Sequence, residues 1–421
     1  MMSRIWAGMI GLALCSCMIP LSACAAGRLE ARWNEPSPRA EPLIVGVQVH
    51  FGEKVEEGGY RPAQTRALIT ELGVGSIRDS LNLARMHDAQ SKPDAASKYQ
   101  TLLDMVRRSG LDSPPLLTVN GAPRGIPPSD PAFFPATIRL ASEAVERAPA
   151  GAIIELWNEW DRSNYFDPSV DAYVRMIDQV VPALRRAGGS RPIVIGAAAD
   201  AEAWTESLIA SGALEAVDGL SVHLYNHCSR EASRAPVIAM FHRLDAIREA
   251  MLLEGHDKPV YVSEVGWPTG GECGIEEQTV ADNLARFVLT APSRPWLRGV
   301  WFYELKDSGI RPADRESHFG IYRFDGSPKA IPCAFAEATR LVRRADIVGY
   351  FEKPDISGVK VRIEDETYSI IWSNRNDRAL TVRLHAPVRS RGLCDRSFAT
   401  TEHLTIGSRP IIVAGDVLSR L

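Results

Sequence analysis

The chain between residues 116 and 157 reads LLTVNGAPRGIPPSDPAFFPATIRLASEAVERAPAGAIIELW. The runs Leu116–Asn120 and Ile153–Trp157 are short and largely apolar, which is typical of buried strands. Between them, Pro135–Ala148 has its apolar residues spaced as on one face of a helix. A strand, a helix and a second strand in this order favour parallel pairing, because the crossover must pass over the sheet. This stretch therefore predicts one unit of an α/β fold.

The same alternation continues on both sides of this unit. Further strand-like runs lie at Leu43–Phe51, Val74–Arg78, Ile193–Ala197, Gly219–Tyr225, Val260–Val265 and Gly299–Leu305. Helical stretches include Gln64–Leu72, Lys98–Ser109, Val170–Ala187, Val237–Leu253 and Glu276–Leu289. Repeated strand–helix units of this length predict a (β/α)₈ TIM barrel over residues 43–343. The alternative is a doubly wound open sheet, but the first strand is not followed by the glycine-rich turn usual in that fold.

From about residue 344 the pattern changes. Short alternating runs are separated by polar turns, and no long helical period appears. These runs are Val359–Ile363, Tyr368–Trp372, Leu380–Leu384 and Pro410–Val413. We expect residues 344–421 to form a small antiparallel β-sandwich.

Composition excludes several classes of protein. The 421 residues include 48 Lys and Arg against 52 Asp and Glu, which gives a net charge of −4. There is no basic excess to neutralise a phosphate backbone, so we expect no nucleic-acid partner. Apolar residues make up 45% of the chain, which fits a globular protein rather than a disordered one. We expect a monomer.

The N-terminal segment has the features of an export signal. Arg4 is followed by the apolar stretch Ile5–Ile19, which is short for a membrane span. Leu21–Cys24 resembles a bacterial lipobox, which predicts a signal peptide over residues 1–23, lipidation of Cys24 and a tether over residues 24–42. The alternative is an ordinary signal cut near Ala26. We expect an exported lipoprotein, anchored to the membrane through its lipid and facing the periplasm or the cell surface.

Four cysteines remain after the signal, namely Cys228, Cys273, Cys333 and Cys394. Export permits disulfides, and four cysteines allow three pairings. We favour Cys228–Cys273, because both residues fall in loops on the same face of the predicted barrel. Cys333–Cys394 would then staple the C-terminal part. Four free thiols are the alternative, and no CxxC pattern indicates zinc.

Residues suited to sugar chemistry gather where the predicted strands end, and in a barrel these ends face the active mouth. They are His50, Arg78, Asn120, Asn158, Glu159, His223, Tyr225, Glu264 and Trp301. Two carboxylates, Glu159 and Glu264, are thus expected to face each other. Glycosidic cleavage needs such a pair, one to protonate the leaving oxygen and one to attack the anomeric carbon. We expect repulsion between them to keep one protonated near neutral pH.

Here the sequence resembles the retaining glycoside hydrolases of clan A. The run IIELWNEW at residues 153–160 and the run YVSEVG at residues 261–266 are similar to glycoside hydrolase family 39, including PslG-like endoglycosidases that trim bacterial exopolysaccharide. Residues 318–321 and 325–329 are similar to the stretch after strand 8 in these enzymes.

The resemblance implies a role for each matching residue. Glu159 matches the general acid/base, Glu264 the nucleophile, and Asn158 the amide that binds the sugar 2-hydroxyl. Arg78 and Tyr225 match residues that hold the nucleophile. His223 lies on the same face as Tyr225.

Four further residues are expected to contact sugar. Trp301 matches an aromatic floor under the scissile sugar, after which the family often has a non-proline cis peptide. His50 and Asn120 are weaker matches. Trp267 lies beyond its strand end, where it could line a sugar groove. Packing in the core is the alternative for His50 and Trp267.

These observations predict a retaining glycosidase that cleaves β-linked sugars of a bacterial exopolysaccharide or plant glycan by double displacement. The two carboxyl groups should lie about 5–5.5 Å apart. We expect no cofactor and no metal ion, since the spacing of His223 and His227 carries no meaning outside a helix. The alternatives are a non-catalytic carbohydrate-binding or matrix-assembly lipoprotein on a glycosidase scaffold, and a transglycosylase.

Overall fold

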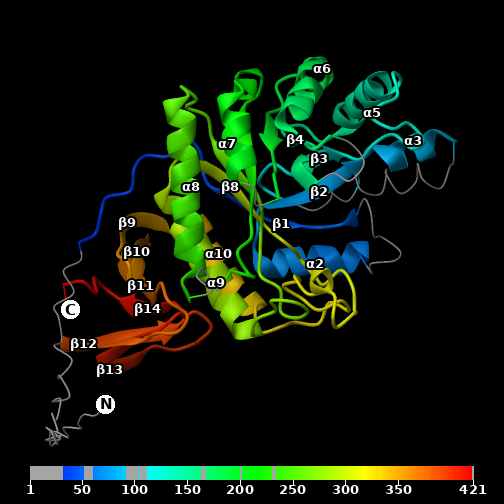
Figure 1. Ribbon diagram of the computed structural model, residues 1–421. Coiled ribbons are helices and arrows are strands. Elements are labelled where there is room, and N and C mark those ends of the chain that lie inside the picture. The colour runs from blue at the N-terminus through cyan, green and yellow to red at the C-terminus, as the bar shows by residue number, and fades with distance from the viewer. Residues whose placement is uncertain are drawn as a thin grey trace, which may run out of the picture. The chain divides into compact units, whose positions relative to one another are not determined.

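A closed barrel of parallel strands forms the centre of the computed structural model (Figure 1). Its strands are β1 (Ile44–Gln48), β2 (Ser76–Asn82), β3 (Leu116–Asn120), β4 (Ile153–Leu156), β5 (Ile193–Gly196), β6 (Gly219–Leu224), β7 (Val260–Val265) and β8 (Leu297–Phe302). Each strand pairs with its neighbour in the sequence, and β8 returns to β1 through the pair Gly46 and Trp301. The structure describes residues 32–51, 60–91, 104, 111–162, 167–199, 202–229 and 234–419.

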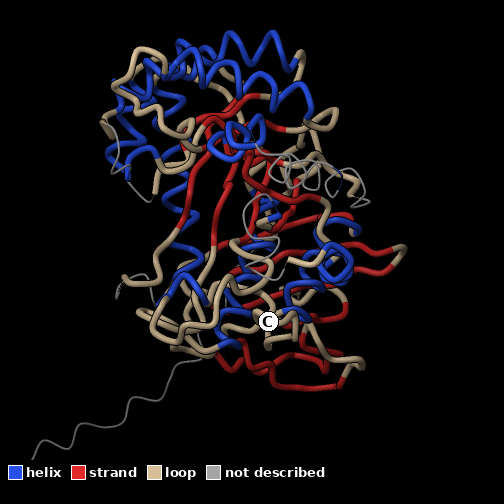
Figure 2. The backbone as a smooth tube through the Cα atoms, turned by 90° about the vertical axis from the view of Figure 1, so that its right-hand side faces the viewer, coloured by secondary structure: helices blue, strands red, loops and turns tan. Residues whose placement is uncertain are grey.

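Helices surround the barrel, as Figure 2 shows with helices in blue and strands in red. They are α2 (Pro62–Leu72), α3 (Leu83–Ser91), α5 (Phe133–Arg147), α6 (Val170–Gly188), α7 (Glu202–Ala210), α8 (Pro236–Leu253), α9 (Glu277–Thr290) and α10 (Pro332–Arg344). Proline starts three of them, where its missing N–H would have no partner in any case. Ser169 caps α6, its hydroxyl accepting from the Ala172 N–H at 3.2 Å.

The bottom of the barrel is filled mainly by residues at the starts of strands, together with the ring of Trp301 from near the end of β8. Ile44, Leu116, Ile153, Val194, Tyr261 and Trp301 form one buried cluster. Trp301 is the largest of them and donates through Nε1 to Ser76 Oγ at 2.9 Å. A Cβ on Gly46 would lie 2.4 Å from the Trp301 ring, so only glycine fits there. The barrel is therefore a packed core below and an open mouth above.

The C-terminal strands form an antiparallel β domain, as we expected, and they belong to one six-stranded sheet. Its order is β13 (Ala399–Ile406), β12 (Leu380–Gly392), β14 (Ile411–Ala414), β11 (Glu366–Ser373), β10 (Ile356–Ile363) and β9 (Asp346–Glu352). The second layer comes from the barrel's own helices. Val359 and Trp372 belong to the same buried cluster as the barrel residues, and Arg286 of α9 donates to the Ser373 carbonyl at 2.9 Å.

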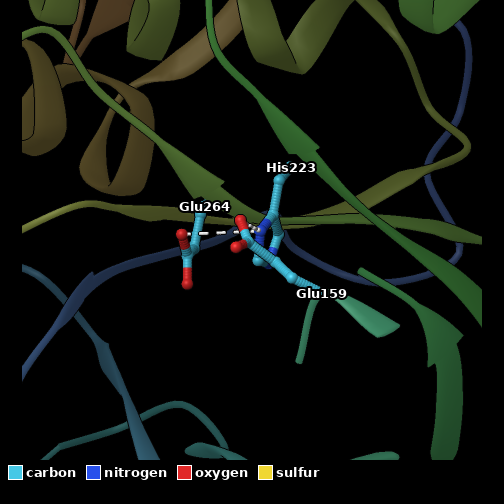
Figure 3. Close-up of side chains that lie close together, drawn as sticks. All are labelled: Glu159, His223 and Glu264. Atoms are coloured by element: carbon cyan, nitrogen blue, oxygen red, sulfur yellow. Dashed lines mark hydrogen bonds and ion pairs between the residues drawn. The ribbon is translucent and has the colours of Figure 1, made fainter. Parts of the chain in front are cut away.

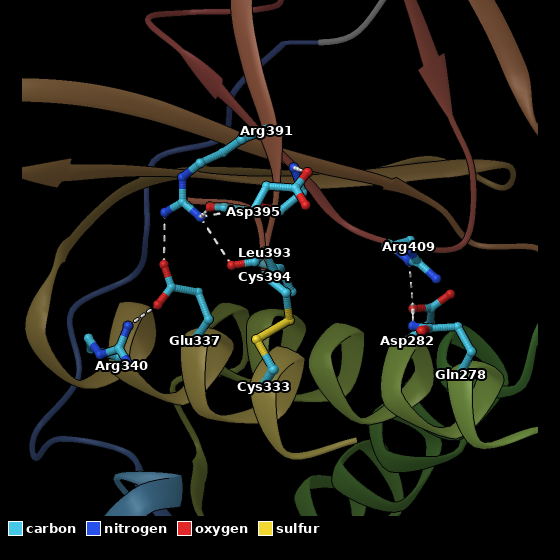
Figure 4. The surroundings of a disulfide bond; sticks show 11 residues. Gln278, Asp282, Cys333, Glu337, Arg340, Arg391, Leu393, Cys394, Asp395 and Arg409 are labelled. Carbon is cyan, nitrogen blue, oxygen red and sulfur yellow. Dashed lines mark hydrogen bonds and ion pairs between the residues drawn. A yellow bond between two sulfur atoms is a disulfide. The ribbon is translucent and has the colours of Figure 1, made fainter. Parts of the chain in front are cut away.

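Both favoured disulfides are present. Cys228 is bonded to Cys273, and Cys333 of α10 is bonded to Cys394 just after β12 (Figure 4). Arg391 adds an ion pair to Glu337 of α10 at 2.8 Å. The C-terminal sheet is thus joined to α10 covalently and by charge.

The predicted signal peptide, Cys24 and the first part of the tether lie outside the described residues. Among the helices that the structure describes, none has the length and apolar character of a membrane span.

Candidate active site

A pocket of about 790 Å³ opens at the carboxyl ends of the barrel strands. It is lined by residues at or just after the ends of β1, β2, β3, β4, β6, β7 and β8, including His50, Ser80, Asn120, Glu159, Tyr225, Glu264 and Tyr303. The structure therefore brings both predicted carboxylates into one opening.

Glu159 is presented by a left-handed turn after β4. Trp157 has φ 70° and Glu159 has φ 47°, values that non-glycine residues rarely adopt and that cost about 1–3 kcal/mol each. Neighbouring strands hold the turn, since the Trp157 N–H donates to the Val119 carbonyl at 2.8 Å and the Glu159 N–H to the Ala197 carbonyl at 3.0 Å. These bonds aim the Glu159 carboxyl into the pocket.

His223 lies close to both carboxylates (Figure 3). Its Nδ1 is 3.1 Å from Glu159 Oε1 and 3.5 Å from Glu264 Oε2. One oxygen of each carboxylate and this nitrogen all lie within 4.8 Å of one another. The two carboxyl groups are therefore close enough to act on the same sugar carbon.

Glu264, at the end of β7, is held by donors on both oxygens. Arg78 Nη1 donates to Oε1 at 2.5 Å, and the Tyr225 hydroxyl donates to Oε2 at 2.6 Å. Burial is the main cause that raises the pKa of Tyr225 well above its usual value, followed by the charge of Glu264. Tyr225 thus stays protonated and remains a donor.

Arg78 links the nucleophile position to three other polar groups. Its Nε and Nη2 donate to Glu155 Oε2 at 2.9 and 2.6 Å, while Nη2 also donates to Asn158 Oδ1 at 2.7 Å. Nη1 donates to Gln48 Oε1 at 2.8 Å. Burial is the largest single cause and raises the pKa of Glu155, but the Arg78 guanidinium, His223 and the hydroxyls of Ser263 and Thr118 together lower that pKa. With its Oδ1 engaged, Asn158 keeps its amide N–H₂ as a donor.

The pKa of Glu159 is shifted in the direction opposite to the one that we expected from repulsion between the carboxylates. Burial is the largest single cause and raises the pKa of Glu159, yet the hydrogen bond and charge of His223, together with the charges of Arg162 and Arg78, lower it. Burial likewise opposes the imidazolium, but Glu264 and Glu159 raise the pKa of His223. The hydrogen bond and charge of His223 thus counter the repulsion between carboxylates that we expected to raise the pKa of one of them. The two groups titrate as a pair.

A further buried pair supports one wall. His50 Nε2 lies 2.8 Å from Glu304 Oε2, and the Tyr60 hydroxyl donates to the same oxygen at 3.4 Å. Both His50 and Asn120 line the pocket, as predicted from their strand ends.

Glu159, His223 and Glu264 each offer one ligand atom, and these atoms lie within 4.8 Å of one another, a spacing that a divalent cation could use. Glu264, however, already accepts from Arg78 and Tyr225, and a cation beside it would face the Arg78 guanidinium. The donor set fits proton transfer better than metal binding.

Comparisons with known proteins agree with this architecture. No family model matches the sequence. A glucan endo-1,3-beta-glucosidase 8 from Arabidopsis thaliana is 35% identical over 95 residues, and this match spans 20% of the chain and 20% of that protein. A family 39 glycoside hydrolase from Bacteroides cellulosilyticus has a TM-score of 0.67 at 21% identity, over 89% of this chain and 81% of that one.

Two other solved structures extend the likeness. A family 39 beta-xylosidase from Caulobacter crescentus has a TM-score of 0.63 at 16% identity, with 91% and 97% of the two chains covered. A family 5 structure from Streptomyces cattleya, in complex with GlcNAc, has a TM-score of 0.53 at 16% identity and covers 73% and 81%. The chain has the fold of the clan A glycoside hydrolases.

Within this fold, two predicted sugar contacts are contradicted. Trp301 is fully buried, its ring packs among residues near the starts of other strands, and it does not line the pocket. Trp267 is 2% exposed and donates to Asn226 Oδ1 at 3.1 Å, so it supports a lining residue from behind. The cis peptide expected after Trp301 lies instead between Tyr303 and Glu304.

Several lining residues were missed. Tyr303 lies two residues after Trp301 and just past the end of β8, so extending the period of the strand could have indicated it. Arg162, His227 and Arg315 line the pocket from loops and short 3₁₀ turns, where no period marks a residue's direction.

Proposed function

We propose that this protein is a retaining glycoside hydrolase that cleaves β-linked sugars in a polysaccharide. The observation that carries the proposal is the approach of Glu159 and Glu264, whose nearest oxygens lie within 4.8 Å across the pocket. Retaining enzymes place their carboxyl groups about 5–5.5 Å apart, whereas inverting enzymes need about 6.5–9.5 Å to admit a water molecule.

In the first step, Glu264 attacks the anomeric carbon as that carbon's bond to the leaving oxygen breaks. Glu159 gives its proton to the leaving oxygen, which departs as a hydroxyl. In the second step, water attacks the glycosyl–Glu264 ester, Glu159 takes a proton from the water, and Glu264 leaves as a carboxylate. The proton used first can come from the Glu159–His223 pair, whose two members are 3.1 Å apart.

The surrounding donors support the charge changes in this cycle. Arg78 and Tyr225 each donate to one oxygen of Glu264 and orient its carboxylate before attack. The Asn158 amide faces the same pocket and can bind a sugar hydroxyl next to the reacting carbon. Such a bond promotes reaction to the extent that it strengthens in the transition state.

The pocket and the similar proteins together support a proposed substrate class. The curated relative acts on β-1,3-glucan by its name, and one structural neighbour is a β-xylosidase. We propose a bacterial exopolysaccharide or a plant glycan as substrate. The disulfides fit an exported protein. We further propose that Cys24 is lipidated and anchors the catalytic barrel at the periplasmic or outer surface of a membrane.

Hydrolysis of dinitrophenyl β-glycosides, in a panel of common sugars, tests the proposal. Glu264→Ala should abolish turnover, and Glu159→Gln should retain far more activity on these substrates than on glycans, because dinitrophenolate leaves without a proton. Glu215→Gln, an exposed control, should behave as the wild type. Full activity in both active-site variants would contradict the proposal. Glycan binding without turnover in the wild type would favour a carbohydrate-binding role instead.

A further inference from the structure

The pocket has a charged wall that the double-displacement mechanism does not use. Arg162 follows Glu159 in the 3₁₀ turn Trp160–Arg162, Arg243 comes from α8, and Arg315 begins the turn Arg315–Ser317. All three line the pocket. Among the described residues that line it, the aromatic carbocycles are those of Tyr225, Tyr303 and Phe319, and no tryptophan is present. This wall offers guanidinium groups where a neutral-sugar site would offer broad aromatic faces.

The three arginines differ in how far they are neutralised. Arg243 Nε lies 3.1 Å from Glu202 Oε1, so this arginine is already paired. Arg315 donates to Glu316 Oε1 from both Nε and Nη2, each at 3.3 Å, and its Nη1 donates to Cys228 Sγ at 3.8 Å. Arg162 donates through Nη2 to the Ala199 carbonyl at 3.0 Å, and no carboxylate of the described residues forms an ion pair with it. Among the described residues, Arg162 therefore has most of its donors left for a ligand.

His227 shows that Arg162 and Arg315 act on the same part of the pocket. Burial, then the charges of Arg315 and Arg162, lower the pKa of His227 to about 4. The imidazole is thus neutral at physiological pH, and its Nδ1 is buried without a hydrogen-bond partner in the described part of the chain. A neutral hydrogen-bonding group near two guanidiniums suits an anion that also carries hydroxyls.

We propose that Arg162 and Arg315 bind the carboxylate of an acidic sugar unit, so that the substrate is a uronate-containing polysaccharide. This inference rests on the proposed glycosidase function. Arginine suits this role because its planar donors match a carboxylate in a charge-assisted, two-point contact.

Matched polysaccharides test the inference. The probes are polyglucuronates made by C6 oxidation of cellulose (β-1,4) and curdlan (β-1,3), each compared with its carboxyl-reduced form. For whichever linkage is cleaved, kcat/KM should be about tenfold or more higher for the carboxylated form, as one charge-assisted contact provides. If neither is cleaved, calorimetric binding to Glu264→Ala should still favour the carboxylated form by a similar factor.

Substitutions of the two arginines test whether they cause the preference for carboxylated substrate. Arg162→Gln and Arg315→Gln should each bring the ratio of carboxylated to reduced substrate toward one. Arg311→Gln, on the same loop but with an 81% exposed side chain paired to Asp314, should leave the ratio unchanged.

Equal or better use of the reduced polymers, or an unchanged ratio in both arginine variants, would overturn the inference. Failure of the proposed function looks different, because then no dinitrophenyl glycoside would be hydrolysed by the wild type either.

Discussion

Replacing Arg78 by methionine should destabilise the protein strongly, because two buried carboxylates would lose their shared cation. Arg78 is 3% exposed, and it donates twice to Glu155 and once to Glu264. Removing one partner of a buried ion pair typically costs about 3–5 kcal/mol. We expect Arg78→Met to lose at least this much free energy of unfolding at pH 7. Urea unfolding followed by tryptophan fluorescence would measure it.

A second substitution separates the unpaired charge from lost packing. Glu155 is fully buried and accepts from Thr118 at 2.7 Å, and it takes no direct part in the proposed chemistry. Glu155→Gln in the Arg78→Met background removes the stranded charge, so the double variant should be more stable than Arg78→Met by about 1–3 kcal/mol. Arg175→Met, an exposed arginine 3.9 Å from Asp167, is the matched control and should change stability by less than about 1 kcal/mol.

The pH dependence of this loss has a defined sign. Since Arg78 lowers the pKa of Glu155 in the folded protein, the contribution of this pair is complete above the unfolded value, near 4.3. It is lost as pH falls through the lower folded value. The stability gap between wild type and Arg78→Met should therefore be full at pH 7 and narrow below about pH 4. Equal stability of the two proteins at pH 7, or a gap that widens in acid, would refute the reasoning.

Three other predictions concern separate parts of the molecule. His223→Asn should move the basic limb of the pH profile of kcat/KM to lower pH. The reason is that His223, whose pKa is raised, would no longer titrate together with Glu159. An unmoved basic limb would count against this coupling. Gly46→Ala should cost about 1–3 kcal/mol in urea unfolding, because its Cβ would lie 2.4 Å from the indole across the β1–β8 pair. Removing the Cys333–Cys394 disulfide by serine substitution should cost about 2–4 kcal/mol while aryl-glycoside turnover at 25 °C stays unchanged, and loss of turnover would place the sheet in the catalytic unit.

Much of the barrel could be predicted because its strands are short apolar runs between amphipathic helices. Leu116–Asn120 and Val260–Val265 have the same bounds in the structure as in the prediction. The positions of Glu159 and Glu264 followed from the rule that strand ends face the mouth.

Whether an inward-facing side chain lies in the barrel core or at the pocket could not be predicted from the strand pattern. Trp301 and Tyr303 are two residues apart, one near the end of β8 and one just past it, but only Tyr303 lines the pocket. Which layer a residue joins depends on the stagger between strands, here fixed by the pairing of Trp301 with Gly46, and a single strand's pattern does not contain that stagger.

The C-terminal sheet shows a similar limit. Alternating runs indicate that one face of each strand is buried, but not what covers it. The helix α9 provides part of that cover, where Arg286 is fully buried and donates to Ser373 and Asn376. Burial lowers the pKa of Arg286 to about 10, which leaves it charged at neutral pH. The sequence alone did not indicate that Arg286, an arginine within a helix, connects the barrel to the C-terminal sheet.

The most direct test of double displacement is to trap the covalent intermediate. A 2-deoxy-2-fluoro glycoside of the sugar accepted in the aryl-glycoside panel should label the protein once, and mass spectrometry of its peptides should place the label on Glu264. A label on another residue, or an enzyme that turns over the parent glycoside yet forms the anomer of inverted configuration by proton NMR, would contradict the mechanism.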